Sequence, residues 1–89
     1  FVNTHNAVAK LNGNIVNSNF GYSIIFAEDG CSKVLSTGND YNYSGTKKAA
    51  LAIIKGTGSK AYFTNDKIRT GAVALKNTDN IFYSNCIYL

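Results

Sequence analysis

The longest run of uncharged apolar residues in this chain is Ala49 to Ile54, only six residues. A transmembrane helix needs about 20 such residues, so the sequence offers no candidate membrane span. The remaining apolar stretches are shorter and are separated by turn signals such as Asn12-Gly13 and Asp29-Gly30. These dipeptides accept the positive φ angles of tight turns. The sequence therefore predicts short elements joined by tight turns.

The clearest local pattern spans Tyr22 to Ser36. Ile24 to Phe26 favours a strand, as does Val34-Leu35, and Asp29-Gly30 stands between them. Because Asp-Gly fits a two-residue hairpin turn, we predict a β-hairpin with Cys31 directly after its turn.

The segment from Thr46 to Lys55 is rich in alanine and contains leucine, both of which favour a helix. Ser44 or Thr46 can cap its N-terminus, and Gly56 can end it. It is apolar on every side from Ala49 to Ile54, so we expect a short helix buried against a sheet. The alternative is a pair of strands, Leu51–Lys55 and Lys60–Thr64, joined by the turn between them.

The last part of the chain reads as two antiparallel strands, 71–76 and 81–88, joined by a turn at 77–80. A helix capped by Thr78 or Asp79 is the alternative for the end. No internal repeat and no linker is apparent. Residues 1–89 are therefore predicted to form a single α+β domain, an antiparallel sheet with one or two helices packed on it as an α/β sandwich.

Composition supports a folded chain and limits its partners. Hydrophobic residues make up 45% and charged residues 16%, which is typical of a globular domain. The net charge is +4, but the lysines are dispersed, only Lys47 and Lys48 being adjacent, and Arg69 is the single arginine. A nucleic-acid partner is not expected from this pattern, whereas weak attraction to an anionic cell wall or membrane is.

Two cysteines, Cys31 and Cys86, are far apart in the sequence. Their spacing suits one long-range disulfide better than a metal site, although two thiols in an intracellular protein, or bonds to another chain, are alternatives. The chain begins at Phe1 and lacks methionine, so we expect a secreted product cut from a precursor. Asn42-Tyr43-Ser44 is a sequon for glycosylation, compatible with that route.

No residue pattern indicates catalysis. The one histidine, His5, lies near the start of the chain, and no set of residues has the spacing of a nucleophile, a metal centre or a phosphate loop. We predict a protein that is not an enzyme and uses no cofactor. Tyr41, Tyr43, Lys47 and Lys48 lie in or beside a polar loop and are the candidate surface-binding residues, because tyrosine is common in surfaces that bind glycans or proteins.

The closing segment "NIFYSNC", with its Phe82-Tyr83-Ser84-Asn85-Cys86 element, resembles the secreted, virally encoded killer toxins of smut fungi and yeasts and the effectors built like them. The resemblance covers about seven residues. It implies an α/β sandwich, processing from a precursor, often with a second subunit, and Cys86 as a structural cysteine. The chain departs from the smut toxins in having few cysteines.

Taken together, the sequence predicts a secreted toxin subunit that binds the cell-wall glycan or membrane of a sensitive fungus and disrupts that membrane. The alternative is a secreted, non-toxic module that binds a carbohydrate or a protein.

Overall fold

The computed structural model describes residues 1–19, 23–44, 49–69, 73–74 and 80–89. In these residues the chain forms twelve β-strands and no helix, and hence no helix that could cross a membrane. Each strand pairs in parallel with the third strand before or after it along the chain, which gives three four-stranded sheets.

The strands of each sheet follow one another in space as they do in the sequence. The first sheet contains β1 (Val2–His5), β4 (Ser23–Glu28), β7 (Ala49–Ile54) and β10 (Val73–Ala74). The second contains β2 (Val8–Asn12), β5 (Lys33–Thr37), β8 (Lys60–Thr64) and β11 (Ile81–Ser84). The third contains β3 (Ile15–Ser18), β6 (Asp40–Tyr43), β9 (Lys67–Arg69) and β12 (Ile87–Tyr88).

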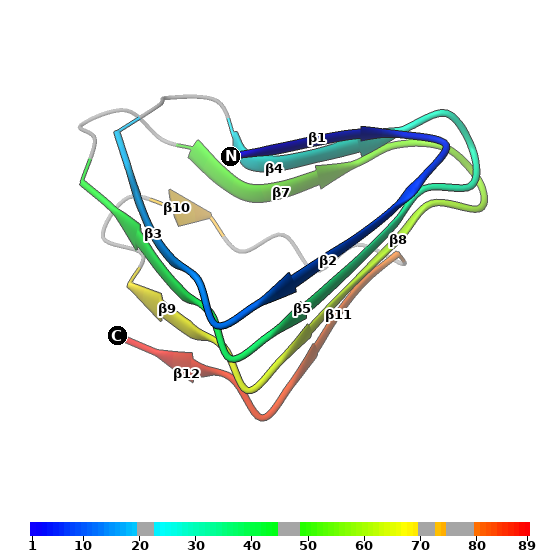
Figure 1. The fold of residues 1–89 in the computed structure, drawn as a ribbon. Helices are drawn as coiled ribbons and strands as arrows, with labels where there is room; N and C mark the ends of the chain where they lie inside the picture. Colours follow the sequence, from blue (N-terminus) through cyan, green and yellow to red (C-terminus); the bar gives the residue numbers. More distant parts are fainter. Residues whose placement is uncertain (20–22, 45–48, 70–72, 75–79) are drawn as a thin grey trace.

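The chain thus winds through one strand of each sheet and then repeats the circuit (Figure 1). We call one circuit a rung, so that β1–β3 form the first rung and β10–β12 the fourth. The triangular outline in Figure 1 is the view along the stack of rungs. Stacked rungs of parallel strands define a parallel β-helix, a solenoid in which each rung contacts only its neighbours.

Alternating burial explains why these segments are strands. In β5, Val34 and Ser36 are buried, whereas Lys33, Leu35 and Thr37 are exposed or half-buried. Because the side-chain period of a strand is two, one face of β5 lies in the core and the other faces outward. The register carries this pattern from rung to rung, with Val34 opposite both Ala9 and Ala61.

The core fills the inside of the triangle. Its fully enclosed side chains come from all three sheets and include Ile25, Val34, Phe63 and Ile68. The Phe63 ring stacks on that of Tyr83 in the next rung, with 5.2 Å between ring centroids. Burying each large side chain of this kind contributes roughly 1.5–3 kcal/mol.

The corner between the first and second sheets depends on backbone that glycine allows. Asp29 and Gly30 have φ angles of 70° and 81°, which turn the chain sharply after β4. The next rung passes so close that a Cβ on Gly58 would lie 2.2 Å from the Gly30 carbonyl oxygen. Any larger residue at position 58 would therefore push the two corners apart.

The corner between the second and third sheets carries a ladder of side chains. We call it the second-corner ladder; its members are Asn14, Asn39, Asp66 and Cys86, one in each rung. The main-chain N–H of Asn14 donates to Asn39 Oδ1 at 2.7 Å, and that of Asn39 donates to Asp66 Oδ1 at 2.7 Å. Each bond joins one rung to the next, so the ladder aligns the rungs at this corner.

Asp66 is fully buried and is the centre of this ladder. Its Oδ2 accepts from the Ser36 hydroxyl at 2.9 Å, and its Oδ1 also accepts from the Asn39 side-chain amide at 3.2 Å. Ser36 Oγ in turn lies 2.6 Å from the hydroxyl of Tyr41. A buried carboxyl group with these partners has its acceptor sites occupied, which is what makes its burial tolerable.

Cys86 takes the ladder position in the fourth rung. Its thiol donates to the main-chain oxygen of Phe63 in the preceding rung at 3.3 Å. Asn39 makes the corresponding bond in the second rung, from its side-chain amide to Leu11 O at 2.7 Å. Cys86 is therefore a packing residue of the last corner.

The predicted α+β sandwich is wrong, because the described residues form only parallel sheets. The segment predicted as a helix contains β7, which pairs with β4 on one side and β10 on the other. A strand enclosed on both faces is apolar throughout, so it has the same short apolar run as a buried helix. Pairing on both edges overrides the helix preference of alanine and leucine. The alternative strands at Leu51–Lys55 and Lys60–Thr64 are present as β7 and β8, but they lie in different sheets and do not pair.

The predicted hairpin is also wrong, although the turn dipeptide was identified correctly. Asp29 and Gly30 adopt the expected positive φ angles, but β5 leaves the corner in a different sheet from β4. The same dipeptide turn can join two strands of one sheet as a hairpin or lead from one sheet into another. Which of the two occurs depends on the strand with which the next segment pairs.

The two antiparallel strands predicted at 71–76 and 81–88 are replaced by three short parallel strands, β10, β11 and β12. The expectation that no internal repeat is present fails as well. Successive ladder corners are offset by 25, 27 and 20 residues, so the repeat has no fixed period.

We predict that Asp66→Ala lowers the free energy of unfolding by about 3 kcal/mol, because buried donors on Asn39 and Ser36 lose their acceptor. Asp40→Ala is the control. It removes only the exposed ion pair with Arg69, whose Nε lies 3.3 Å from Asp40 Oδ1, and should cost less than ~1 kcal/mol. Urea denaturation followed by circular dichroism measures both, and equal losses would contradict a special role for the ladder.

Two tyrosine-to-phenylalanine substitutions should have different effects on the free energy of unfolding. Tyr83 Oη is buried and has no partner among the described residues, so Tyr83→Phe should leave stability unchanged or raise it by about 1 kcal/mol. Tyr41→Phe removes a buried bond to Ser36 and should lower stability by about 1–2 kcal/mol.

Burial also raises the pKa of Tyr83 to about 12. Because the unfolded tyrosine ionises near pH 10, the stability that Tyr83 contributes should be lost as the pH rises from about 10 to 12. Tyr83→Phe should lessen this alkaline loss, measured by urea denaturation at stepped pH values. An unchanged loss would mean that other groups cause it.

Candidate functional site

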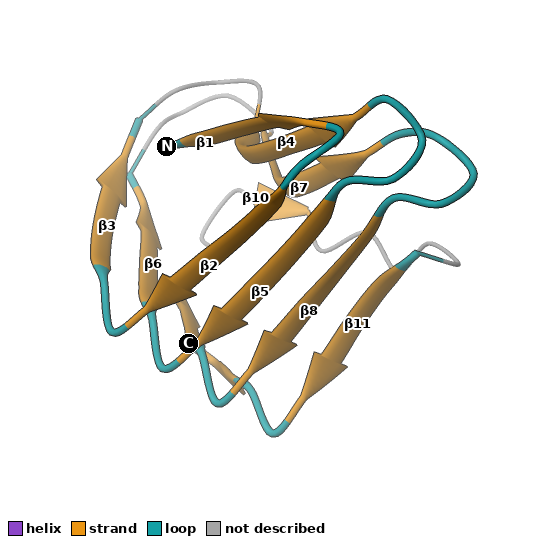
Figure 2. Cartoon of the chain, turned by 45° about the vertical axis from the view of Figure 1, so that its right-hand side comes forward, coloured by secondary structure: helices purple, strands orange, loops and turns teal. Residues whose placement is uncertain are grey.

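The outer face of the second sheet is formed by four adjacent strands. Figure 2 shows β2, β5, β8 and β11 side by side, with no other described element in front of them. Parallel pairing in register arranges the outward side chains in rows along the stack. Three such rows differ in chemistry: a lysine row, an apolar row and a hydroxyl row.

The lysine row contains Val8, Lys33 and Lys60, which are register partners on β2, β5 and β8. Lys33 and Lys60 are both exposed, and neither forms an ion pair with a described residue. Strands in a sheet are about 4.8 Å apart, so the two lysine side chains leave the sheet next to one another. Like charges in this position repel, and an anion bound between them would relieve that repulsion.

The apolar row contains Leu35, Tyr62 and Phe82, preceded by Lys10 in the first rung. The rings of Tyr62 and Phe82 stack with 5.1 Å between centroids and 15° between their planes. Phe82 is 43% exposed, which is unusual for a ring of this size in a small domain. The row forms an apolar strip in the middle of the face.

The hydroxyl row lies on the other side of the strip. Its members are Asn12, Thr37, Thr64 and Ser84. These side chains both donate and accept hydrogen bonds. A flat face with cations on one side, hydroxyls on the other and an apolar strip between them can bind an extended ligand that has anionic groups, hydroxyls and C–H surfaces.

The structure places two of the predicted binding residues elsewhere. Tyr41 and Tyr43 are only 1% and 7% exposed and belong to the core, so they cannot contact a surface ligand. Burial raises the pKa of Tyr41 well above its usual value, with the hydroxyl bonded to Ser36. The predicted polar loop contains β6, and its tyrosines point inward because they alternate with Asp40 and Asn42 on the outer face.

The other two predicted binding residues, Lys47 and Lys48, lie outside the described residues. The sequon residue Asn42 is on the outer face of the third sheet, where its amide donates to Asn17 Oδ1 at 3.1 Å.

The predicted disulfide between Cys31 and Cys86 is absent, and both residues are free thiols. Cys31 follows the first corner and Cys86 lies at the second, so they are at opposite ends of the second sheet. Its five-residue strands separate those ends by roughly 17 Å. A disulfide needs Cα atoms within about 7 Å of one another, so the two residues cannot be bridged in this fold.

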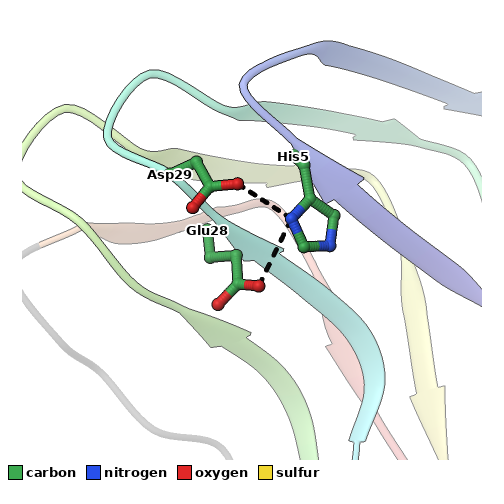
Figure 3. Close-up of side chains that lie close together, drawn as sticks. All are labelled: His5, Glu28 and Asp29. Carbon is green, nitrogen blue, oxygen red and sulfur yellow. Dashed lines mark hydrogen bonds and ion pairs between the residues drawn. The ribbon is translucent and has the colours of Figure 1, made fainter.

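A second group of polar side chains lies at the first corner. His5, Glu28 and Asp29 point toward one another (Figure 3). His5 Nδ1 is 2.9 Å from Asp29 Oδ2 and 3.3 Å from Glu28 Oε1. Their ligand atoms lie within 4.8 Å of one another and could hold a divalent cation. All three side chains are 33–58% exposed, and the hydrogen bond between His5 and Asp29 accounts for the arrangement without a metal.

Sequence reasoning missed the second-sheet face, although a signal was present. The segments "KVLST" and "KAYFT" both begin with lysine, end in threonine and place one large side chain midway on the same face. They are β5 and β8, aligned in register. Alignment of these two segments would have identified the rows.

We predict that both thiols are free and react at different rates. In the native protein, exposed Cys31 should be alkylated rapidly, whereas Cys86, which is packed against Phe63 O, should be alkylated slowly. In urea, where the chain is unfolded, both thiols should be alkylated rapidly. Mass spectrometry of the alkylated chain measures this, with Cys31→Ser as the control that removes the fast phase. Two cysteines that resist alkylation until a reductant is added would contradict the free-thiol structure.

Comparisons of the chain with protein-family models, with curated proteins and with solved structures found no match. No relative therefore supplies a function, a ligand or a site residue. The three rows of the second sheet are the observation from which a function can be argued.

Proposed function

We propose that this chain is a non-catalytic binding module and that the outer face of its second sheet holds an acidic polysaccharide. The observation that carries the proposal is the pair of adjacent, unpaired lysines, Lys33 and Lys60, beside the apolar and hydroxyl rows. Each feature matches one part of such a ligand. The lysines suit its carboxylates, the strip suits the C–H faces of its sugar rings, and the hydroxyl row suits its hydroxyl groups.

The shape of the face supports an extended ligand. The rows run along the stack and repeat at the strand spacing of about 4.8 Å, close to the length of one sugar residue in a linear polymer. A linear glycan lying along the rows can therefore meet equivalent side chains on successive rungs. A compact ligand would gain nothing from this repetition, and no buried cavity is needed.

Nucleic acid is the less suitable polyanion. Its recognition usually uses arginine, and the one arginine, Arg69, is on the third sheet and pairs with Asp40.

The toxin interpretation loses part of its basis, because the resemblance to killer toxins implied an α/β sandwich and the chain is a parallel β-helix. Its cell-surface target, a wall glycan, is consistent with the proposed ligand. Secretion belongs to the same proposal, since acidic polysaccharides are polymers of walls and extracellular matrices. Membrane disruption and a second toxin subunit are not part of it.

We predict that the chain binds polygalacturonate, a polymer of uronic acids, in a salt-dependent way. Lys33→Ala with Lys60→Ala should weaken binding at least tenfold, and Tyr62→Ala severalfold, because each removes one class of contact. Isothermal titration calorimetry at two salt concentrations measures the affinities.

Lys55→Ala with Lys67→Ala is the matched control, since it removes the same two charges from positions outside the second sheet. If the control weakened binding equally, binding would depend on the net charge of the chain and not on the second-sheet face. Binding of neutral glucan as tightly as polygalacturonate, or of single-stranded DNA more tightly, would overturn the proposed ligand.

A further inference from the structure

The large apolar side chains that the described residues expose are confined to the two ends of the solenoid. All seven belong to the first or the fourth rung or flank it: Phe1, Val8, Ile15, Phe82, Ile87, Tyr88 and Leu89. The two middle rungs expose none among their described side chains. Ile15 is 74% exposed and Ile87 is 53% exposed. Covering such a side chain lowers the free energy, because it removes apolar surface from water.

The strands at the ends also have open edges. Among the described strands of the second and third sheets, β2 and β3 each pair on one side only, with β5 and β6. β11 and β12 likewise pair only with β8 and β9. The unpaired main-chain N–H and C=O groups of such edges are templates for another strand. Because all pairs in the solenoid are parallel, a further rung running in the same direction continues the existing pattern.

From these features we propose that copies of this chain stack head to tail, the fourth rung of one copy pairing in parallel with the first rung of the next. The proposal is independent of glycan binding. It places β11 beside β2 and β12 beside β3 of the following copy, in the register of the internal rungs.

The rows match in this arrangement. In the outer row of the third sheet, Ile15, Asp40, Lys67 and Ile87 are register partners. This row is charged in the middle and apolar only at its two ends. Head-to-tail stacking brings Ile87 of one copy against Ile15 of the next, so both are covered by a partner of the same kind. In the second sheet it brings Lys10 beside Phe82, where the cation can lie over the ring.

The second-corner ladder has a direction that favours the same arrangement. In each bonded step the main-chain N–H of one rung donates to a side-chain oxygen of the rung after it, as from Asn14 to Asn39 and from Asn39 to Asp66. Asn14 also directs its side-chain nitrogen toward Asn39. Because the nitrogen of this amide is used within the chain, its Oδ1 is the atom that would accept from the N–H of Cys86 in a preceding copy.

A head-to-tail contact does not close on itself, so it produces linear assemblies whose size grows with concentration. Sedimentation velocity of the 89-residue chain over a range of concentrations should show masses that pass beyond a dimer. Ile87→Asp and Ile15→Lys should each abolish growth, since each places a charge in the contact. Thr37→Asp is the control, because it adds the same charge to an exposed position of a middle rung.

A mixing experiment distinguishes head-to-tail stacking from other contacts. Ile87→Asp alone and Ile15→Lys alone should be monomeric, but an equal mixture should assemble again, because alternating copies join opposite charges in one contact and two isoleucines in the next. Circular dichroism confirms that each variant is folded.

Three outcomes would overturn the proposal. The folded chain could stay monomeric at every concentration. Ile87→Asp could abolish assembly while Ile15→Lys leaves it intact, which means a two-fold contact between fourth rungs. The mixture could also fail to recover when the unaltered chain assembles.

Discussion

The fold depends on main-chain hydrogen bonding between successive rungs. Within a rung the three strands lie in different sheets, so no strand pairs with its neighbour in sequence. Every strand finds its partners one circuit away, and alignment at the corners decides whether all three strands of a rung pair together. The buried carboxyl group of Asp66 and its bonds to Asn39 and Ser36 provide that alignment where the second and third sheets meet. The sheet rows, and hence the proposed site, exist only because this register is kept.

In-register stacking gives the molecule two different kinds of surface. On the sides, each outward position is repeated along the stack, so a single lysine in β5 becomes a lysine row with its partner in β8. In the first and fourth rungs of residues 1–89, described strand edges and apolar side chains are exposed. The proposed glycan face uses the first kind of surface and the proposed self-assembly uses the second. Stacking of copies would also lengthen the rows, so that a longer polymer meets more than one chain.

The residues of the terminal segment "NIFYSNCIYL" have distinct places in the fourth rung. Its similarity to a toxin element rests on the order of Phe82, Tyr83 and Cys86. In the structure these residues are explained by their places in the fourth rung: Phe82 faces outward against Tyr62, Tyr83 stacks inward on Phe63, and Cys86 occupies a corner. Ile81 of this segment is buried, Tyr83 and Cys86 pack against the core, and Phe82 is exposed. The disulfide expected to hold it does not form.

The sequence by itself determined that the elements are short, that they meet at tight turns, and where several of those turns lie. Gly13, Asp29 and Gly30 adopt the positive φ angles that their residue types favour, because that preference is local. Only the tertiary structure decided which strands pair, since parallel partners are a full circuit apart and the circuits differ in length. It also decided which aromatic and lysine side chains face outward, because one position of register exchanges the two faces of a strand. Tyr41 and Tyr43 were therefore mistaken for surface residues, while Lys33, Lys60 and Tyr62, which form the candidate face, were not identified.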